Sequence, residues 1–375
     1  MKNILKKMFI IDGIKLFMIT TYNKLGTSDL NVSQICIGTM TFGEQTNKEE
    51  AFKILDYAYE NGINFIDTAE MYPIYPKKET QGLTEIIIGN WIKEKKNRDK
   101  IILGTKISSN HPDGIGATRL EWIRGGGKKL RFDKDNFKQA IDDSLKRLKT
   151  DYIDLYQLHW PERLVQLTGQ LDFTYNPKDT KWTPILEVLE NLEDLKKKGK
   201  IRNFGLSNET SWGITKFIYT SEKHNLIRPA SIQNAYNLIN RVFDISNSEI
   251  SLREQCSLVA HSPLAGGRLS GKYLNGNRPA KNRYTLWPGR SSKHHSPKVQ
   301  TAVQKYMNIA SKYGIKLSDI ANSFVISRPF VASTIFGVTS LSQLKMNLNC
   351  LNLSLSNELI SELNQIHIDD PNPCV

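Results

Sequence analysis

The sequence of 375 residues has no apolar run that approaches the roughly 20 residues needed to cross a bilayer. It also lacks a GxGxxG motif after a predicted strand, which disfavours a doubly wound dinucleotide-binding domain. Its four cysteines lie far apart and form neither a CxxC pair nor a Cys/His spacing suited to zinc. From these absences we expect a cytoplasmic protein with reduced thiols, no membrane partner and no metal.

The chain carries 51 Lys and Arg against 38 Asp and Glu, a formal net charge of +13. Such an excess is found in nucleic-acid-binding proteins, whose basic side chains neutralise phosphates. Here the basic residues stand beside acids on predicted helix faces, as in residues 93–96 (KEKK), and no arginine-rich arm is present. We therefore expect no nucleic-acid partner, although the same positive field would favour an anionic small molecule.

The first residues are basic and then apolar, but Asp12 and Lys15 interrupt the apolar stretch and no small-residue cleavage site follows. We therefore expect no secretion signal. Residues 1–17 are expected to form a disordered N-terminal extension, and residues 18–375 a single domain.

From Tyr22 onward, short β-branched apolar segments alternate with longer amphipathic ones, which is typical of repeated βα units and a parallel sheet. The segments predicted as strands are 34–38, 64–67, 101–106, 152–159, 201–207, 230–234, 257–261 and 333–337. Eight is the number that a closed parallel barrel requires. We therefore predict an α/β fold, a (β/α)8 TIM barrel.

Two predicted helices between these strands are the clearest. In residues 137–148 the apolar side chains recur with a period of 3.6 and share one face. The second helix is predicted to have Thr183 as its N-cap, Pro184 at its first position and its end at Gly199.

Two further features concern the ends of the barrel. Residues 22–32 are predicted to form an N-terminal β-hairpin, with its turn at 26–29, that plugs the bottom. Three long loops, 108–133, 161–182 and 263–297, follow strand ends, at the C-terminal face where such barrels build their sites.

Polar residues stand at the ends of three consecutive predicted strands. Asp67 ends the second strand and Tyr72 lies just beyond it, while Lys106 ends the third and His159 the fourth. Each residue alone has an ordinary structural explanation, since a strand-end Asp caps loops, a Tyr packs, a Lys reaches solvent and a His is satisfied in a core. Because all four face one barrel mouth, we predict that they act together.

Their chemistry suits the reduction of a carbonyl. The developing alkoxide needs a proton, and a phenol with an ordinary pKa near 10 needs a nearby cation to stabilise its phenolate. Lys106 can supply that cation, and Asp67 can keep the buried ammonium charged. The imidazole of His159 can donate a hydrogen bond to the carbonyl oxygen.

Eight segments resemble, in order, motifs of the aldo-keto reductase superfamily: IGTMTFGEQ, FIDTAEMY, LGTKIS, LYQLHWPER, GLSNET, QNAYNLINR, SPLAGGRLSGKY and FGVTSLSQLKMN. Within it, HWPER, QNAYNLINR and PFVASTIFGVTS resemble the Tas-like branch, which is related to potassium-channel beta subunits. The resemblance implies an NADP(H)-dependent oxidoreductase that reduces aldehydes or ketones by direct hydride transfer. It implies the catalytic residues Asp67, Tyr72, Lys106 and His159, with Tyr72 as general acid.

The resemblance also implies that NADPH lies extended across the barrel mouth. Residues 39–40 would flank the nicotinamide ribose, and Ser207, Asn208 and Gln233 would hold the carboxamide. The 262–266 run would wrap the pyrophosphate, and the start of the helix after the eighth strand would bind the adenosine end. The implied cofactor-binding residues are Thr39, Met40, Asp67, Ser207, Asn208, Gln233, His261, Ser262, Pro263, Leu264, Ala265, Gly266, Lys272, Arg283, Gly337, Thr339, Gln343 and Asn347.

The sequence departs from the family pattern at three of these positions or their neighbours. His261 stands where the family usually places Tyr or Trp to stack on the nicotinamide, and Gln343 and Met346 stand where other branches carry charged residues. The expectation of NADP rather than NAD therefore rests chiefly on Arg283, which would reach the 2′-phosphate. Three aromatic residues in or next to the mouth loops could line the substrate pocket or simply pack: Tyr75, Trp160 and Trp182.

Two other functions fit parts of the same pattern. A non-catalytic protein could bind nicotinamide and report redox state to a partner, but a pure binder would not need the general acid. A Schiff-base aldolase could use Lys106 as its nucleophile, but Asp67 would keep that amine protonated. The complete set of four side chains favours the reductase.

Overall fold

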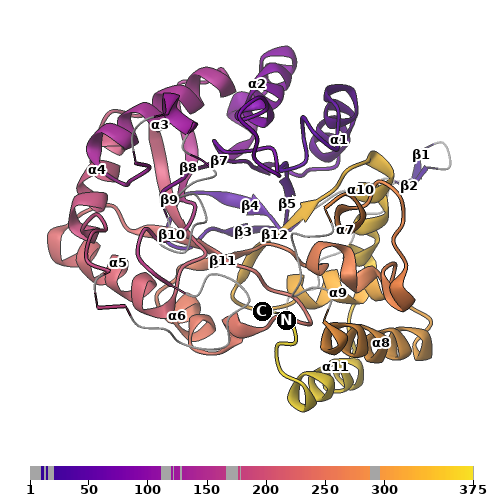
Figure 1. The fold of residues 1–375 in the computed structure, drawn as a ribbon. Coiled ribbons are helices and arrows are strands. Elements are labelled where there is room, and N and C mark those ends of the chain that lie inside the picture. Colours follow the sequence, from indigo (N-terminus) through magenta and orange to yellow (C-terminus); the bar gives the residue numbers. More distant parts are fainter. Residues whose placement is uncertain are drawn as a thin grey trace.

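The computed structural model describes residues 21–110, 120, 122–126, 129–165, 176–177, 179–287 and 296–374, and the backbone of 10–11 and 14–15. Eight parallel strands close into one barrel in chain order, with the last strand pairing with the first (Figure 1). They are β5 (Ile35–Gly38), β6 (Phe65–Asp67), β7 (Ile102–Ile107), β8 (Ile153–Leu158), β9 (Ile201–Ser207), β10 (Pro229–Gln233), β11 (Ser257–Ala260) and β12 (Val331–Gly337). The predicted TIM barrel is confirmed, and every predicted strand agrees to within two residues at each end.

Helices surround the barrel on its outside (Figure 1). They are α1 (Lys48–Glu60), α2 (Leu83–Lys95), α3 (Lys134–Leu148), α4 (Ile185–Lys197), α5 (Ser211–His224), α6 (Asn247–Arg253), α8 (Pro297–Lys312), α9 (Leu317–Ile326), α10 (Leu341–Leu348) and α11 (Asn357–Asp369). The predicted apolar face of 137–148 is the buried face of α3, whose N-cap Asp133 accepts a hydrogen bond from the Asn136 backbone.

The start of α4 differs by one residue from the prediction. Pro184, not Thr183, occupies the N-cap, and the helix begins at Ile185. The Thr183 hydroxyl accepts a hydrogen bond from the Arg131 guanidinium at 3.3 Å, so a tertiary contact engages the group predicted to cap the helix. The predicted end is confirmed, since the helix stops at Lys197 and Gly199 has a positive φ of 69°.

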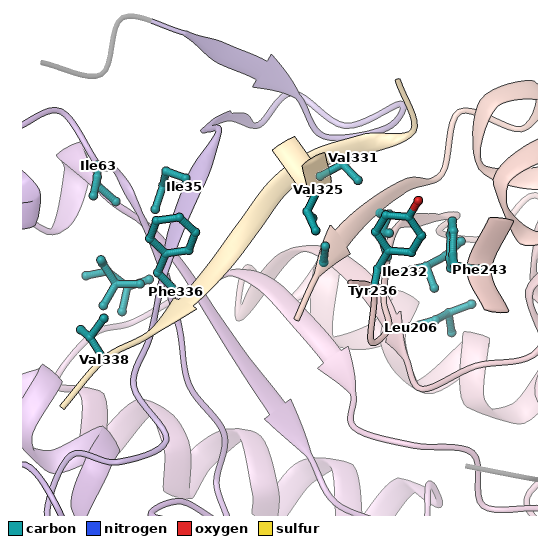
Figure 2. Close-up of a cluster of buried hydrophobic side chains, with 14 of the residues drawn as sticks. Ile35, Ile63, Leu206, Ile232, Tyr236, Phe243, Val325, Val331, Phe336 and Val338 are labelled. Atoms are coloured by element: carbon teal, nitrogen blue, oxygen red, sulfur yellow. The ribbon is translucent and has the colours of Figure 1, made fainter. Parts of the chain in front are cut away.

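Side chains on each strand alternate between the barrel interior and the layer under the helices, as the period of two requires. On β5, Cys36 belongs to the interior cluster, whereas Ile35 and Ile37 belong to the large cluster between sheet and helices. Figure 2 shows part of this outer layer, with Ile35 beside Phe336 of the neighbouring β12. The inward positions near the strand ends are therefore the ones that can carry polar chemistry.

A hairpin formed by β3 (Tyr22–Lys24) and β4 (Asn31–Ser33) precedes the barrel, as predicted. Leu25 is completely buried and lies in the interior cluster with Phe65, Leu155 and Val259. These residues lie on the strands before their C-terminal ends. The hairpin therefore closes the end of the barrel opposite the C-terminal ends of the strands.

The third predicted loop is not devoid of helices. Residues 263–297 contain the short helices η4 (Ala265–Ser270), η5 (Leu274–Gly276) and α7 (Arg283–Leu286). Parts of all three predicted loops, at 111–119, 121, 127–128, 166–175, 178 and 288–295, lie outside the described residues.

The predicted disordered extension, residues 1–17, also lies outside the described residues, apart from the antiparallel backbone pairing of β1 (Ile10–Ile11) with β2 (Ile14–Lys15). In the part of the chain that is described, no helix is long and apolar enough to span a membrane. All four cysteines are buried and none is bridged to another.

Candidate active site

The predicted catalytic residues come from three adjacent strands and one turn. Asp67 is the last residue of β6, Lys106 lies one residue before the end of β7, and His159 follows β8 directly. Tyr72 lies in the turn after β6, where its backbone N–H donates to Ala69 O at 3.1 Å. These three strands are neighbours in the parallel barrel, so their C-terminal ends bring the four side chains to the same end of the barrel.

Lys106 and Asp67 form an ion pair inside the barrel. The Lys106 Nζ lies 2.6 Å from Asp67 Oδ2 and donates also to Thr68 O at 2.7 Å, and its side chain is completely buried. Burial disfavours the charged amine, but Asp67, followed by Tyr72, outweighs it and raises the pKa of Lys106. Lys106 is therefore held as a cation, as predicted from the pairing of the two residue types.

Tyr72 lies next to this cation. The Lys106 Nζ is 5.2 Å from the centroid of the Tyr72 ring. Burial raises the pKa of the Tyr72 phenol, whereas Lys106 lowers it by its charge and by a side-chain hydrogen bond. The expected effect of the cation is present, but burial is the larger cause and the pKa stays above its ordinary value. The phenol is thus fully protonated at neutral pH.

His159 packs against Tyr72 in an edge-on arrangement, with ring centroids 5.7 Å apart. Burial lowers the pKa of His159 well below its ordinary value, and the charges of Lys106 and His261 lower it further. A neutral imidazole carries one N–H donor and one acceptor nitrogen. Within the described part of the chain, His159 Nδ1 is buried and has no hydrogen-bond partner.

Asp67 is also held by two amides. Its Oδ1 accepts from Gln157 Nε2 and from Gln233 Nε2, each at 2.9 Å, and Gln233 Nε2 donates to Gln157 Oε1 at 2.8 Å. Gln233 was predicted from the sequence, whereas Gln157 was not. The sequence signal that could have identified Gln157 is its position two residues before His159. In an extended segment this spacing puts both side chains on the inward face.

Glu70 is a second residue near the site that was not predicted from the sequence. It is buried two residues before Tyr72, and its Oε1 accepts from the Ser108 backbone N–H at 2.6 Å. Arg124 lies 3.7 Å from the same oxygen and donates to Ser108 O at 2.6 Å. Burial raises the pKa of Glu70. The carboxyl group ties the turn that carries Tyr72 to the end of β7.

The residues predicted to hold the carboxamide adjoin the four side chains. Asn208 Nδ2 donates to His159 O at 2.9 Å and to Ser207 Oγ at 3.2 Å, and Ser207 Oγ donates to Gln233 O. His261 follows β11 and lies 3.4 Å from Asn208 Oδ1 through its Nε2. These residues form a continuous polar rim over the ends of β8 to β11.

The segment 39–46 connects this centre to the regions predicted to hold the rest of the cofactor. Thr39 Oγ1 donates to Asp67 O at 2.8 Å, and Met40 O accepts from the Ile74 backbone N–H. Arg283 Nη2 lies 3.4 Å from Met40 Sδ. Further along, the Thr46 hydroxyl donates to Thr339 O at 3.4 Å. The segment therefore contacts Asp67 at one end and Thr339 at the other.

Two predicted phosphate ligands, Lys272 and Arg283, lie close enough for their charges to interact. Lys272 Nζ donates to the neutral Asn282 side chain at 2.7 Å. Burial lowers the pKa of Lys272, and the charge of Arg283 lowers it further. Neither cation forms an ion pair with a described carboxylate. Two like charges so placed fit a polyanionic ligand, and the residues present therefore suit the phosphates of a dinucleotide.

The remaining predicted cofactor residues follow β11, end or follow β12, or belong to α10. Ser262, Ala265 and Gly266 have positive φ values of 59°, 47° and 65°, which bend the backbone sharply after β11. The Gln343 Oε1 accepts from the Thr339 backbone N–H at 3.0 Å at the start of α10. Among the described residues, Pro263, Leu264, Gly337 and Asn347 form no hydrogen bond, ion pair or ring contact with the four catalytic candidates.

The aromatic residues near the mouth have mainly packing contacts. Trp160 is buried with its ring 4.5 Å from that of His159, and its Nε1 donates to Ser109 O at 2.8 Å. Tyr75 lies edge-on to Trp287 at 5.0 Å, and Trp182 Nε1 donates to Asp179 O at 3.2 Å.

A family model described as the aldo/keto reductase family matches residues 34–368. The chain belongs to the aldo/keto reductase family. It is 41% identical over 349 residues to the protein Tas of Escherichia coli, which covers 92% of this chain and 97% of that protein. It is also 32% identical over 355 residues to the uncharacterized oxidoreductase YrpG of Bacillus subtilis, covering 92% of this chain and 95% of that protein.

These likenesses confirm the predicted superfamily and the Tas-like branch. A protein named aldo-keto reductase from Babesia bovis is 37% identical over 285 residues, covering 72% of this chain and 96% of that protein. Family membership and the oxidoreductase names of the relatives support an oxidoreductase of the aldehyde- and ketone-reducing kind.

Proposed function

We propose that this chain is an NADP(H)-dependent reductase of aldehydes and ketones, with Asp67, Tyr72, Lys106 and His159 as its catalytic residues. One observation carries the proposal: the buried Lys106 ammonium lies between Asp67 Oδ2, at 2.6 Å, and the Tyr72 ring, whose other neighbour is the neutral His159. This arrangement supplies a proton donor, a cation to stabilise its anion and a donor for the carbonyl oxygen at one place.

Each side chain has a distinct part in the proposed reaction. Reduced nicotinamide, when bound, supplies the hydride to the carbonyl carbon. The neutral His159 donates a hydrogen bond to the carbonyl oxygen and orients it. As negative charge develops on that oxygen, Tyr72 transfers its phenolic proton to it, which yields the alcohol. Lys106 stabilises the phenolate that remains, and Asp67 keeps Lys106 charged.

The cation pair supports the choice of NADP(H) over NAD(H). The 2′-phosphate that distinguishes NADP adds close to two negative charges. Lys272 and Arg283 repel each other and neither forms an ion pair with a described acid, so an anionic ligand would relieve that repulsion.

Turnover of 4-nitrobenzaldehyde with NADPH tests the proposal. We expect the wild type to consume NADPH, and Tyr72→Phe to lower kcat by at least about 10²-fold because the general acid is lost. Quenching of protein fluorescence by NADPH should be nearly the same in both, since the substitution removes only the hydroxyl.

Two results would contradict the proposal. Tight NADPH binding without turnover across a broad panel of carbonyl compounds would favour the redox-sensing function instead. A borohydride-trapped adduct of substrate on Lys106 would favour the aldolase.

A further inference from the structure

Gln157 lies at the centre of the site although an amide takes no direct part in carbonyl reduction. Its side chain is completely buried on β8. Burying an amide is costly unless it is hydrogen-bonded. Here both ends of the amide are used, since Nε2 donates to Asp67 Oδ1 at 2.9 Å and Oε1 accepts from Gln233 Nε2 at 2.8 Å.

The neighbouring strands leave space for this side chain by carrying glycines. Gln157 pairs in register with Gly205 of β9, where a Cβ would lie 3.4 Å from Gln157 Cγ and 2.6 Å from Ser231 Oγ. On the other side, a Cβ at Gly104 of β7 would lie 3.3 Å from Gln157 Nε2. Three adjacent strands thus form the position that the amide occupies.

The carboxylate of Asp67 and the amide of Gln157 together orient the amide of Gln233. An ionised carboxylate only accepts hydrogen bonds, so Gln157 and Gln233 must both turn their Nε2 toward Asp67 Oδ1. The Gln157 Oε1 then accepts the second N–H of Gln233. Both N–H groups of Gln233 are thereby engaged. Its Oε1, at the end of β10, has no hydrogen-bond partner among the residues described.

We infer that Gln157 is a positioning residue that holds the amide of Gln233 so that the Gln233 Oε1 is available as an acceptor. Gln233 then selects a ligand whose own amide donates an N–H to this oxygen. The inference rests on the proposed NADP(H) function, in which that amide is the carboxamide of nicotinamide. Without Gln157, Gln233 keeps only one of the two contacts that set its direction, and its choice of a donor ligand weakens.

A cofactor that lacks the carboxamide donors tests this inference. The 3-acetylpyridine analogue of NADPH carries an acetyl group, which can accept but cannot donate a hydrogen bond. Fluorescence quenching gives the dissociation constants of NADPH and of this analogue for the wild type, Gln157→Met and Leu155→Met. The last is a matched control, because Leu155 lies inward on the same strand, two residues earlier, and outside the amide network.

We expect the wild type and Leu155→Met to bind NADPH about tenfold more tightly than the analogue, as one hydrogen bond between neutral groups implies. In Gln157→Met this ratio should fall to about twofold or less. If Gln157→Met does not fold, as judged by circular dichroism, Gln157→Leu carries the same expectation.

Three outcomes separate the inference from the proposed function. If Gln157→Met weakens both ligands by the same factor and the ratio persists, the amide is merely structural and the inference is wrong. If the wild type shows no preference for NADPH over the analogue, Gln233 does not select a donor ligand, and the inference is again wrong. If the wild type binds neither ligand, the proposed function itself fails.

Discussion

Burial, followed by the charges of Lys106 and His261, keeps the imidazole of His159 neutral. The charges that act on it are those of Lys106 and His261, and the aromatic rings of Tyr72 and Trp160 pack against it. A protonated ring would be a second cation next to the one that Tyr72 needs. The neutral form instead offers a hydrogen-bond donor without competing with Lys106 for Asp67.

This lowered pKa predicts a pH dependence of stability. The unfolded chain takes up a proton on His159 near its ordinary pKa of 6.5, whereas the folded chain does so only at much lower pH. Between these values the unfolded state binds more protons, so the free energy of unfolding falls as pH drops below about 6.5, by up to about 1.4 kcal/mol per pH unit. Above that pH, His159 adds no slope.

Urea unfolding at about pH 7.5 and 5.5 measures this effect. We expect the wild type to lose about 1 kcal/mol more than His159→Gln between the two conditions. The pKa of His367 is also lowered by burial, but this residue is present in both proteins and its contribution cancels. An equal loss in the two proteins would show that His159 titrates normally in the folded state.

The hairpin β3–β4 is the element that closes the bottom of the barrel, and its turn touches the strand ends there. Gly26 has a φ of 57°, and a Cβ at this position would meet Ala230 O and would lie 2.6 Å from Gln255 O. Both atoms are backbone and cannot rotate away. Gly199, in the turn after α4, has a similar φ of 69° but nothing within 4 Å of a built Cβ.

These two glycines form a matched pair for a prediction about the hairpin. Gly199→Ala should cost about 1 to 2 kcal/mol, because only the left-handed backbone is strained. Gly26→Ala should cost about 1 to 3 kcal/mol more, because the closely packed backbone must also move. Midpoints of urea unfolding report the difference. Equal destabilisation would mean that the hairpin does not pack tightly against β10.

For the molecule as a whole, the net charge of +13 affects the binding of any anionic ligand. Arg283 places part of that charge beside Met40 of the segment 39–46, and Lys272 lies close enough to interact with it. Opposite charges at an exposed site attract less strongly as salt screens them. The effect should be larger for NADPH than for NADH, because the 2′-phosphate adds charge.

We therefore expect the dissociation constant of NADPH to rise more steeply than that of NADH as salt increases from about 50 to 300 mM. Arg283→Met should bring the two slopes close together. Arg278→Met removes the same charge from an exposed position five residues before Arg283. It should leave the difference in slope between NADPH and NADH unchanged. If the dissociation constants of the wild type do not change with salt, charge no longer supports the choice of NADP(H).

Much of the fold could be predicted because its signals are local. Short apolar segments between turn residues mark the strands, and the 3.6 period of 137–148 marks α3. The candidates Asp67, Lys106 and His159 follow from the same pattern, since the ends of neighbouring parallel strands share one edge.

The short helices within 263–297 and the cap of α4 were not predictable in the same way. Thr183 has the residue type of an N-cap, but its hydroxyl is engaged by Arg131 from a distant segment. The helices η4, η5 and α7 lie in a stretch rich in glycine, asparagine and proline, where composition favours loops.

The sequence by itself determined the barrel, its strand order and the end of the barrel where polar side chains gather, because periodicity and strand termini are properties of neighbouring residues. Only the tertiary structure decided that Gln157 joins Asp67 to Gln233, that burial outweighs Lys106 in setting the pKa of Tyr72, and that Glu70 holds its turn. These effects depend on distances and on the exclusion of water between strands far apart in the chain, and neither quantity is written in any one segment.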